Sequence, residues 1–176
     1  MKKSILVTGI AGSGKSTVCR ELNKLGYRAH DIEDIRGLFR MLDEKTSKVF
    51  KGYNNDHLGK VRRGRWICNI KRLQKFIKSE NNPLVFYCGT ASNMDEVIPL
   101  FDLVVLLKSS PKVLRQRLSS RKPGNFGRTK EVQDWILSWK DRSEKTKGKM
   151  GAIVIDADGR PKEVAKNIIK IATAKN

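Results

Sequence analysis

The chain has 176 residues, and its 37 Lys and Arg against 18 Asp and Glu give a formal net charge of +19. This length suits one domain with a core of its own, and 39% hydrophobic residues argue against a disordered chain. Such a charge indicates an anionic partner, namely nucleic acid, an anionic membrane or phosphorylated ligands. No stretch approaches the length of a membrane-spanning helix, so we expect no membrane partner.

The cysteines exclude two classes of small protein. Cys19, Cys68 and Cys88 are odd in number and show no CxxC spacing, which argues against a disulfide framework and a structural zinc site. The apolar run at 5–8 is too short for a signal peptide. We therefore expect a reducing, cytoplasmic setting.

The first half of the chain predicts two strands and three helices. Apolar runs predict strands at 4–8 and 27–31, and helical spacing predicts a helix at 15–25. A second helix is expected through residues 35–42, a loop at 45–55 and one continuous helix at 57–79.

The second half predicts three further strands, at 84–88, 103–107 and 152–156, each a continuous apolar run typical of a strand buried on both faces of a parallel sheet. Helices are expected to begin at Pro111, Thr129 and Pro161. The segment 121–128 is rich in Gly, Pro and Arg and is expected to form a mobile loop over a site. Strands that alternate with helices predict a doubly wound α/β domain over 1–176.

Residues 9–16 match the pattern GxxxxGK[ST] in full, directly after the first predicted strand. Small residues let the backbone wrap a phosphate chain, helix N–H groups supply positive potential, and the lysine reaches the terminal phosphates. The pattern predicts binding of ATP and Mg²⁺, with Ser16 as a metal ligand and Lys15 as a catalytic cation. The predicted nucleotide-binding residues of this loop are Gly9, Ala11, Gly12, Ser13, Gly14, Lys15, Ser16 and Thr17.

Carboxylates follow the second predicted strand, where ligands of doubly wound sheets bind. Asp31 is the first candidate for the metal's water shell or for accepting a proton from an attacking hydroxyl, and Glu33 is the second. The alternative is that Asp31 caps the next helix. No acidic residue ends the strand at 84–88, which favours small phosphotransferases over mechanical ATPases.

Basic residues precede and follow the Gly-rich segment. Arg117 and Arg121 are spaced to share a helix face, and Arg128 follows the loop. Guanidinium groups that close over a transferring phosphoryl group stabilise its charge and exclude water. The alternative is a solvated basic face.

Two histidines and three tryptophans have simpler expected roles. His30 and His57 have no third metal ligand nearby, so surface or capping roles are expected. Trp66, Trp135 and Trp139 lie at helical positions and are expected in the core.

Five segments of the chain together carry a resemblance to a known family: GIAGSGKST, HDIED, VFYCGTASN, LRQRLSSRKPGNFGR and IDADGRPKEV. Over nearly its whole length the chain resembles the small P-loop kinases of the adenylate kinase and shikimate kinase group. The resemblance implies a three-layer α/β/α P-loop NTPase fold with a five-stranded parallel sheet in the order 2-3-1-4-5. It also implies an acceptor-binding region between the second and third strands, which we assign to 45–78, and a short lid at 121–129.

The resemblance also implies residue roles. Arg117 would contact adenine or phosphate, Arg121 and Arg128 the phosphates, and the turn from Asp156 the base. Asp31 and Glu33 would match the Asp-x-Asp pair that serves metal and substrate in shikimate kinases.

The sequence departs from both named enzymes. CGTASN replaces the shikimate kinase glycine triplet and the adenylate kinase DGFPR signature is absent, so neither substrate carries over. Gly89 and Asn93 are expected to approach the acceptor.

The positive charge is concentrated in two segments. Residues 45–78 hold 11 basic residues and 1 acidic residue, and residues 112–149 hold 12 and 4. These segments are the expected acceptor region and lid, so the acceptor is expected to carry several phosphates, and an RNA or DNA end is one candidate. The alternative is a solvated helix face.

The sequence therefore predicts an ATP-dependent phosphotransferase that acts on an anionic, nucleotide-like or nucleic-acid acceptor. The alternative is a nucleic-acid-binding ATPase that uses hydrolysis as a switch. The sequence identifies neither the acceptor nor the oligomeric state.

Overall fold

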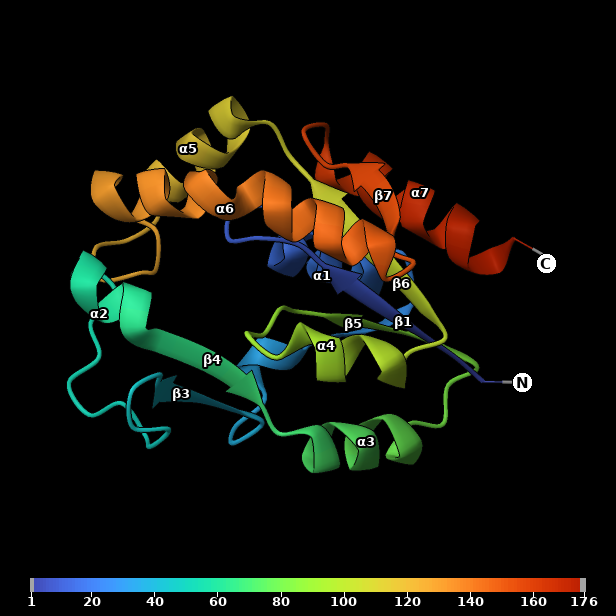
Figure 1. Ribbon diagram of the computed structural model, residues 1–176. Coiled ribbons are helices and arrows are strands. Elements are labelled where there is room, and N and C mark those ends of the chain that lie inside the picture. The colour runs from blue at the N-terminus through green and yellow to red at the C-terminus, as the bar shows by residue number, and fades with distance from the viewer. Residues whose placement is uncertain (1, 175–176) are drawn as a thin grey trace.

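A parallel five-stranded sheet forms the centre of the computed structural model, which describes residues 2–174. The strands lie in the order β2-β5-β1-β6-β7 (Figure 1), and each neighbouring pair is parallel. Their bounds are β1 Lys3–Thr8, β2 Arg28–Asp31, β5 Leu84–Cys88, β6 Leu103–Lys108 and β7 Ile153–Asp156. All five strands end at one edge of the sheet, so the loops that follow them meet there.

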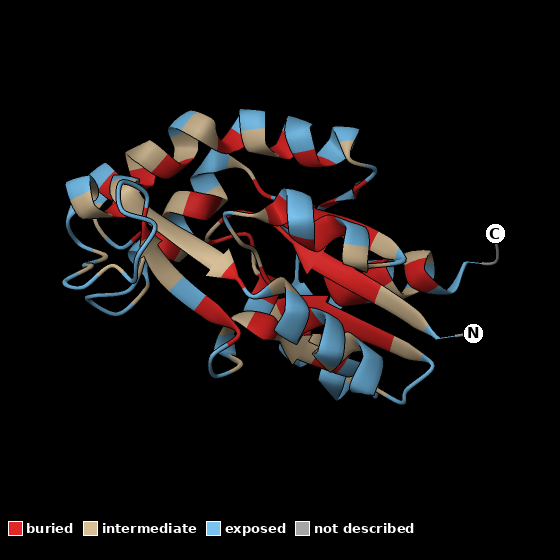
Figure 2. Ribbon diagram, turned by 60° about the horizontal axis from the view of Figure 1, so that its bottom comes forward, coloured by how far each residue is buried: buried red, intermediate tan, exposed pale blue. Residues whose placement is uncertain are grey.

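Helices cover both faces of the sheet, and the buried side chains lie between the layers (Figure 2). On one face α1 and α7 pack through side chains such as Leu22 and Ile168, and on the other α3 and α4 pack through Leu73 and Val97. The helices are α1 Lys15–Lys24, α2 Leu58–Arg63, α3 Ile70–Ser79, α4 Met94–Val97, α5 Pro111–Ser119, α6 Lys130–Lys149 and α7 Pro161–Thr173, with 3₁₀ turns η1 Ile32–Asp34 and η2 Ile98–Leu100.

The expected α/β fold with a five-stranded parallel sheet is confirmed, and the details differ in two places. Two additional strands precede β5 in the chain, so the order 2-3-1-4-5 becomes 2-5-1-6-7 when all strands are numbered. The last strand is not buried on both faces, because β7 lies at the sheet edge and leaves Ile153 39% and Val154 51% exposed.

The additional strands replace predicted helices. The helix expected through 35–42 is instead β3 (Phe39–Asp43), and it pairs antiparallel with β4 (Gly64–Cys68), which interrupts the helix expected at 57–79. The Phe39 ring stacks on Trp66 with centroids 5.2 Å apart. A Cβ on Gly64 would lie 2.6 Å from the Tyr53 ring, so the tight packing at this point requires glycine. These contacts between distant residues override the helical spacing.

A third cluster lies over the carboxyl edge of the sheet, where α2, α5 and α6 meet through Val61, Leu118 and Ile136. The loop between α5 and α6 covers this cluster, and the Asn55 side chain donates to the Gly124 carbonyl at 3.0 Å. The loop before α2 therefore contacts the predicted lid.

Cys19, Cys68 and Cys88 are free thiols, and all three are buried. Within residues 2–174, none of the helices has the length and apolar content needed to cross a bilayer.

Candidate active site

The loop between β1 and α1 has the backbone geometry of a phosphate-binding loop. A Cβ on Gly9 would lie 2.4 Å from Ser13 Oγ and 2.8 Å from the Leu107 carbonyl oxygen. Gly14 has a φ of +99° and is the N-cap of α1. No side chain caps α1, so the first-turn N–H groups, which have no partner within the helix, are available to a ligand anion.

Lys15 lies buried in this loop. Its Nζ donates to the carbonyl oxygens of Gly9 at 3.0 Å and Ile10 at 3.3 Å, and it lies 4.0 Å from Glu33 Oε1. Burial lowers the Lys15 pKa, the Glu33 carboxylate opposes that shift and the Arg121 charge adds to it. The lysine is therefore a desolvated cation beside one carboxylate.

The two candidate carboxylates have different partners. Asp31 Oδ1 accepts from the Glu33 N–H at 3.3 Å and caps η1, which is the alternative role considered for it. Glu33 accepts from the Thr90 N–H at 3.0 Å and from Trp66 Nε1 at 3.2 Å. Of the two carboxylates, Glu33 is the one within 4.0 Å of Lys15 Nζ, and the catalytic roles of both stay predictions.

The arginines separate into three environments. Arg117 donates to the carbonyl oxygens of Gly12 at 3.4 Å and Ala157 at 2.8 Å, so it links the phosphate loop to the turn after β7. Arg121 donates to the Phe126 carbonyl at 2.6 Å, and burial lowers its pKa. Arg128 is exposed and does not line the cavity described next.

One large cavity of about 1060 Å³ lies at the carboxyl edge of the sheet. Ligand pockets commonly measure about 300–1,000 Å³, so the volume admits a nucleotide and a second small molecule. The phosphate loop and the first turn of α1, residues 10–18, line one part of the cavity. Charged, polar and aromatic side chains line the remainder, including Asp31, Glu33, Arg65, Trp66, Arg117, Arg121, Trp135, Trp139, Ser143 and Lys147.

Sequence reasoning missed the contribution of α6. Trp135 and Trp139 were expected in the core, yet they line the cavity while also packing against the third cluster. Lys147 was not singled out, although it is buried and lines the cavity too. The available signal was the spacing of four residues along 135, 139, 143 and 147, which places these positions on one helix face.

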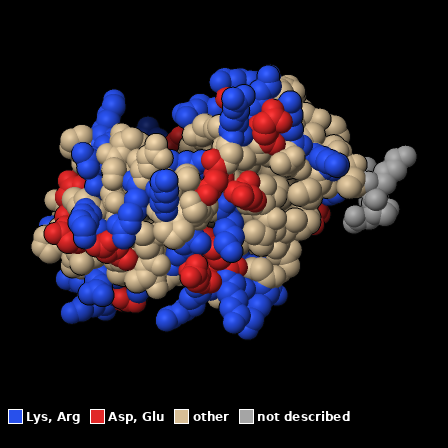
Figure 3. Space-filling model, turned by 90° about the horizontal axis from the view of Figure 1, so that it is seen from above, with Lys and Arg blue, Asp and Glu red and all other residues tan. Residues whose placement is uncertain are grey.

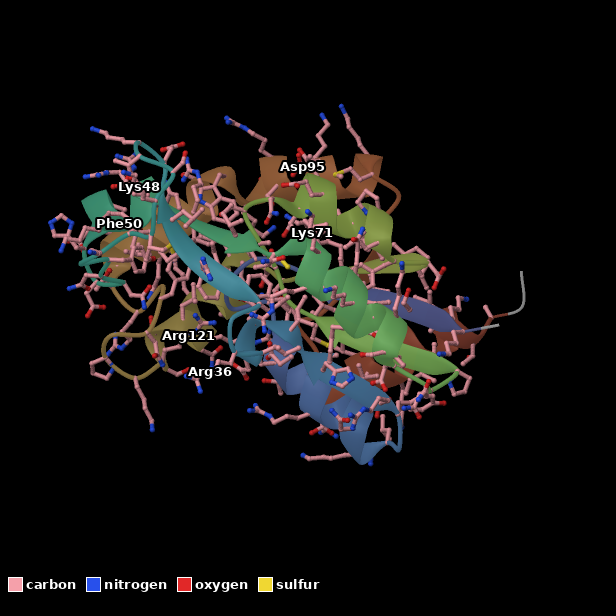
Figure 4. The ribbon with its side chains drawn as sticks, turned by 90° about the horizontal axis from the view of Figure 1, so that it is seen from below. Arg36, Lys48, Phe50, Lys71, Asp95 and Arg121 are labelled. Atoms are coloured by element: carbon pink, nitrogen blue, oxygen red, sulfur yellow. The ribbon has the colours of Figure 1, made fainter. Side chains whose placement is uncertain are left out.

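The basic segment 45–78 contributes less to the cavity than its charge indicated. Of its cationic side chains only Arg65 is among the lining residues, and Arg65 pairs with Glu44. Arg63 pairs with Asp43 and lies over the Phe50 ring. In Figure 4 the labelled Lys48 and Lys71 lie on separate elements from Arg121.

Lys and Arg on the face seen in Figure 3 are spread among acidic side chains and form no single stripe. Of the cationic side chains of segment 45–78, Arg65 alone lines the cavity, so the rest of this charge lies away from it.

Several other predicted residues have structural partners. Asn93 bonds to the backbone of Cys68 at both its amide oxygen and nitrogen, and Gly89 is absent from the lining, which is formed at this point by residues 90–92. The expected approach of these two residues to an acceptor stays a prediction, and in this structure Asn93 joins the loop after β5 to β4. Asp156 accepts from the Asp158 N–H at 2.9 Å and shapes the turn whose Ala157 lines the cavity.

The histidines have different roles. His57 caps α2, as one of its two expected roles required. His30 is neither a cap nor a surface residue: its Nε2 lies 2.5 Å from Glu80 Oε2. Hydrogen bonding to His30 lowers the Glu80 pKa to about 2.

A magnesium site was expected at Ser16 and Asp31. Both line the cavity, and Ser16 is exposed at the start of α1. Within residues 2–174, no group of three or more His, Cys, Asp or Glu side chains could hold a metal by itself. Because Mg²⁺ in phosphoryl-transfer sites takes one or two protein ligands together with substrate phosphates and water, the sparse oxygen donors here fit that ion.

Comparisons with known proteins agree with this geometry. A model of the AAA domain family matches residues 5–136. A search of curated protein sequences found no match.

Among solved structures, TT1252 from Thermus thermophilus has a TM-score of 0.59 at 18% identity and covers 99% of both chains. Deoxyadenosine kinase from M. mycoides with bound dATP has a TM-score of 0.59 at 18% identity, over 97% of this chain and 100% of that one. Shikimate kinase from Bacteroides thetaiotaomicron has a TM-score of 0.57 at 18% identity, over 98% and 99%. At these identities the likeness establishes the fold.

The family match spans three quarters of the chain, and the resemblance to small P-loop kinases seen in the sequence is confirmed. The chain belongs to the AAA domain family and has the fold of the small P-loop kinases.

Proposed function

We propose that the protein is an ATP-dependent phosphotransferase that transfers the γ-phosphoryl group of ATP to a small anionic acceptor. The observation that carries the proposal is the pairing of Lys15 with Glu33 inside a cavity of about 1060 Å³. One side of that cavity is the phosphate loop, and the other is lined by side chains that ATP does not require. An acceptor could therefore lie next to the terminal phosphate.

The nucleotide side would use mostly backbone groups. The first-turn N–H groups of α1 and the Lys15 ammonium would bind the phosphates. Arg117 is fixed between the phosphate loop and the turn after β7, where it would contact the base or the α-phosphate. Ser16 and Asp31 would hold Mg²⁺, which supplies charge neutralisation at the phosphates.

The transfer side would use Glu33 and Arg121. An acceptor oxygen attacks the γ-phosphorus, the bond to the β-phosphate oxygen breaks, and Glu33 takes the proton when the acceptor is a hydroxyl. Lys15 and Arg121 would offset the charge that develops on the phosphoryl oxygens. Residues 121–129 would act as the lid, and Arg128 would reach the phosphates on closure.

Related folds do not fix the acceptor, because the similar structures include a deoxyadenosine kinase and a shikimate kinase. The strands beside β1 argue against a mechanical ATPase, since β5 and β6 end in Cys88 and Lys108 rather than in a carboxylate. A kinase that acts on a small molecule remains the function the geometry supports best.

The test is a screen of nucleosides, nucleotides, hydroxy acids and short RNAs with γ-labelled ATP and Mg²⁺. We expect ADP formation that depends on one acceptor class, with the label transferred to it. ADP release that RNA stimulates without any labelled product would contradict the kinase proposal and support the switch ATPase.

A further inference from the structure

Lys147 is a buried cation for which the structure gives no carboxylate partner. Its residue is only 8% exposed, and its Nζ donates to Ser143 Oγ at 2.6 Å. Among residues 2–174, no carboxylate oxygen lies within 4.0 Å of this nitrogen. Burial is the main cause that lowers the Lys147 pKa, the Lys15 charge lowers it further, and the Glu144 carboxylate, although more than 4.0 Å away, opposes the shift.

Lys140, on the same helix, is a buried lysine that does have carboxylate partners. It is 4% exposed, and its Nζ lies 2.8 Å from Glu144 Oε2 and 3.3 Å from Asp141 Oδ1. Removing a charge from water costs free energy that a nearby opposite charge offsets. Lys140 is hydrogen-bonded to this opposite charge, whereas Lys147 lies at the cavity with Glu144 beyond 4.0 Å.

The helix face that carries Lys147 also carries two aromatic rings. Trp135, Trp139, Ser143 and Lys147 are spaced four residues apart and all line the cavity. The two indole rings meet edge to face, with centroids 5.5 Å apart. The Trp139 Nε1–H is buried and has no acceptor in the described chain. One face of α6 thus combines two indole rings, a buried N–H donor without an acceptor in the described chain, and a buried cation with no carboxylate within 4.0 Å.

We propose that this face of α6 is the acceptor subsite, in which Lys147 binds a carboxylate or phosphate group of the acceptor while Trp135 and Trp139 pack against its ring. The acceptor class is a small planar anion. This inference rests on the proposed function, because it takes the second ligand of the cavity to be the phosphoryl acceptor.

The nucleotide would leave this subsite free. The first-turn N–H groups of α1 and the Lys15 ammonium would bind the nucleotide's phosphates. Arg117, which would contact the base or the α-phosphate, is hydrogen-bonded to the Ala157 carbonyl, outside α6 in the chain. Lys147 is therefore not needed to complete the nucleotide site, and its compensating anion would belong to the other ligand.

The experiment is equilibrium binding without turnover, in protein saturated with Mg²⁺ and a non-hydrolysable ATP analogue. The probes form matched pairs that differ by the anionic group: AMP against adenosine, and 4-hydroxybenzoate against phenol. Calorimetry and tryptophan fluorescence give the affinities. The pair that binds distinguishes a phosphate from a carboxylate on the acceptor.

We expect the anionic member of one pair to bind at least about 10-fold more tightly to the native protein, as a charge-assisted hydrogen bond allows. Lys147→Gln should remove this advantage, and Lys147→Arg should restore much of it. Lys145→Gln, the matched control, removes the same charge from an exposed position of α6 and should bind as the native protein does. Affinity for the ATP analogue alone should stay within about twofold in all three variants.

Loss of affinity for the ATP analogue in Lys147→Gln would overturn the proposal, because the lysine would then belong to the nucleotide site. An unchanged anionic advantage, or no binding by any probe, would overturn it as well. Thermal unfolding reports whether each variant folds, and Lys147→Arg tests the charge if Lys147→Gln does not fold. The two proposals can fail separately. If the labelled-ATP screen shows transfer to an acceptor, and Lys147→Gln transfers it at the native rate, then the kinase proposal holds and the acceptor-subsite proposal fails.

Discussion

The two sides of the cavity are built in different ways. The proposed nucleotide side consists of consecutive residues whose backbone N–H groups would bind phosphates, with Gly14 at a φ of +99° and no side-chain cap on α1 among the described residues. The acceptor side consists of side chains from β4, the loop after β5, and α6, which are far apart in the sequence. The first side is encoded locally, and the second exists only when the chain is folded.

This difference explains how the two sides respond to change. A site built from backbone tolerates little substitution at its glycines, because a side chain there would displace the backbone or its neighbours. A site made from side chains can change its ligand by one or two substitutions. The chain shares its fold with a deoxyadenosine kinase and a shikimate kinase, whose printed substrates differ.

The largest effect is expected from Lys15→Ala. It removes the one buried cation of the phosphate loop, and turnover should fall about 10³-fold while the circular dichroism spectrum stays native. Steady-state ADP formation measures this. Lys24→Ala, which removes an exposed lysine of the same helix, is the control and should retain native turnover. Turnover above one tenth of native in Lys15→Ala would contradict the phosphate-loop assignment.

Glu33→Gln tests whether Glu33, which lies between the nucleotide side and the acceptor side, is the general base. If Glu33 receives the acceptor proton, kcat should fall about 10²-fold with little change in KM for ATP. Asp31→Asn keeps an oxygen that can cap η1 and should lower kcat less. A larger loss in Asp31→Asn than in Glu33→Gln would restore Asp31 as the base. An acceptor that offers a phosphate oxygen would make both effects small.

The elements that could be predicted share one physical property, which is that local sequence determines them. The apolar runs of the five sheet strands and the GxxxxGK[ST] loop are short-range features, and the structure contains all of them. The β3–β4 ribbon could not be predicted, because Phe39 stacks on Trp66, 27 positions away in the chain. Glu33 was a candidate from its place after the second strand, but its hydrogen bonds to Trp66 and Thr90 could not be predicted, because these partners come from other elements.

Gly9→Ala tests how far the nucleotide side depends on backbone packing. The new Cβ would meet Ser13 Oγ at 2.4 Å and the Leu107 carbonyl oxygen at 2.8 Å, so the loop must shift. We expect a loss of about 1–3 kcal/mol in the free energy of unfolding, and weaker ATP binding. Gly26→Ala is the control: it has a φ of +86° with no heavy atom within 4 Å of the new Cβ, so it should cost about 1 kcal/mol of strain and leave ATP affinity unchanged. Equal ATP affinity in both variants would contradict a backbone-built site.

Glu80→Gln tests stability away from both sides of the cavity. The His30 hydrogen bond lowers the Glu80 pKa to about 2 from 4.5, so the ionised carboxylate stabilises the fold above about pH 4.5 and that stability is lost as pH falls toward 2. At pH 6 the variant should lose about 0.5–1.5 kcal/mol in urea unfolding, with native turnover per folded molecule. The difference between native protein and variant should shrink at pH 3. A difference that grows there would contradict the sign of the shift.

A triple Lys→Gln variant at three exposed positions of α3, Lys71, Lys75 and Lys78, tests whether the positive charge outside the cavity affects acceptor binding. These side chains are absent from the cavity lining, so KM for the acceptor should change less than about twofold, and its salt dependence should keep its slope. Arg65→Gln, which changes the one basic residue of segment 45–78 in the lining, should raise KM more than the triple variant does. A flatter salt dependence in the triple variant would mean that the acceptor extends across α3, as a nucleic-acid end would. The +10 of this segment would then be a binding surface rather than a solvated helix face.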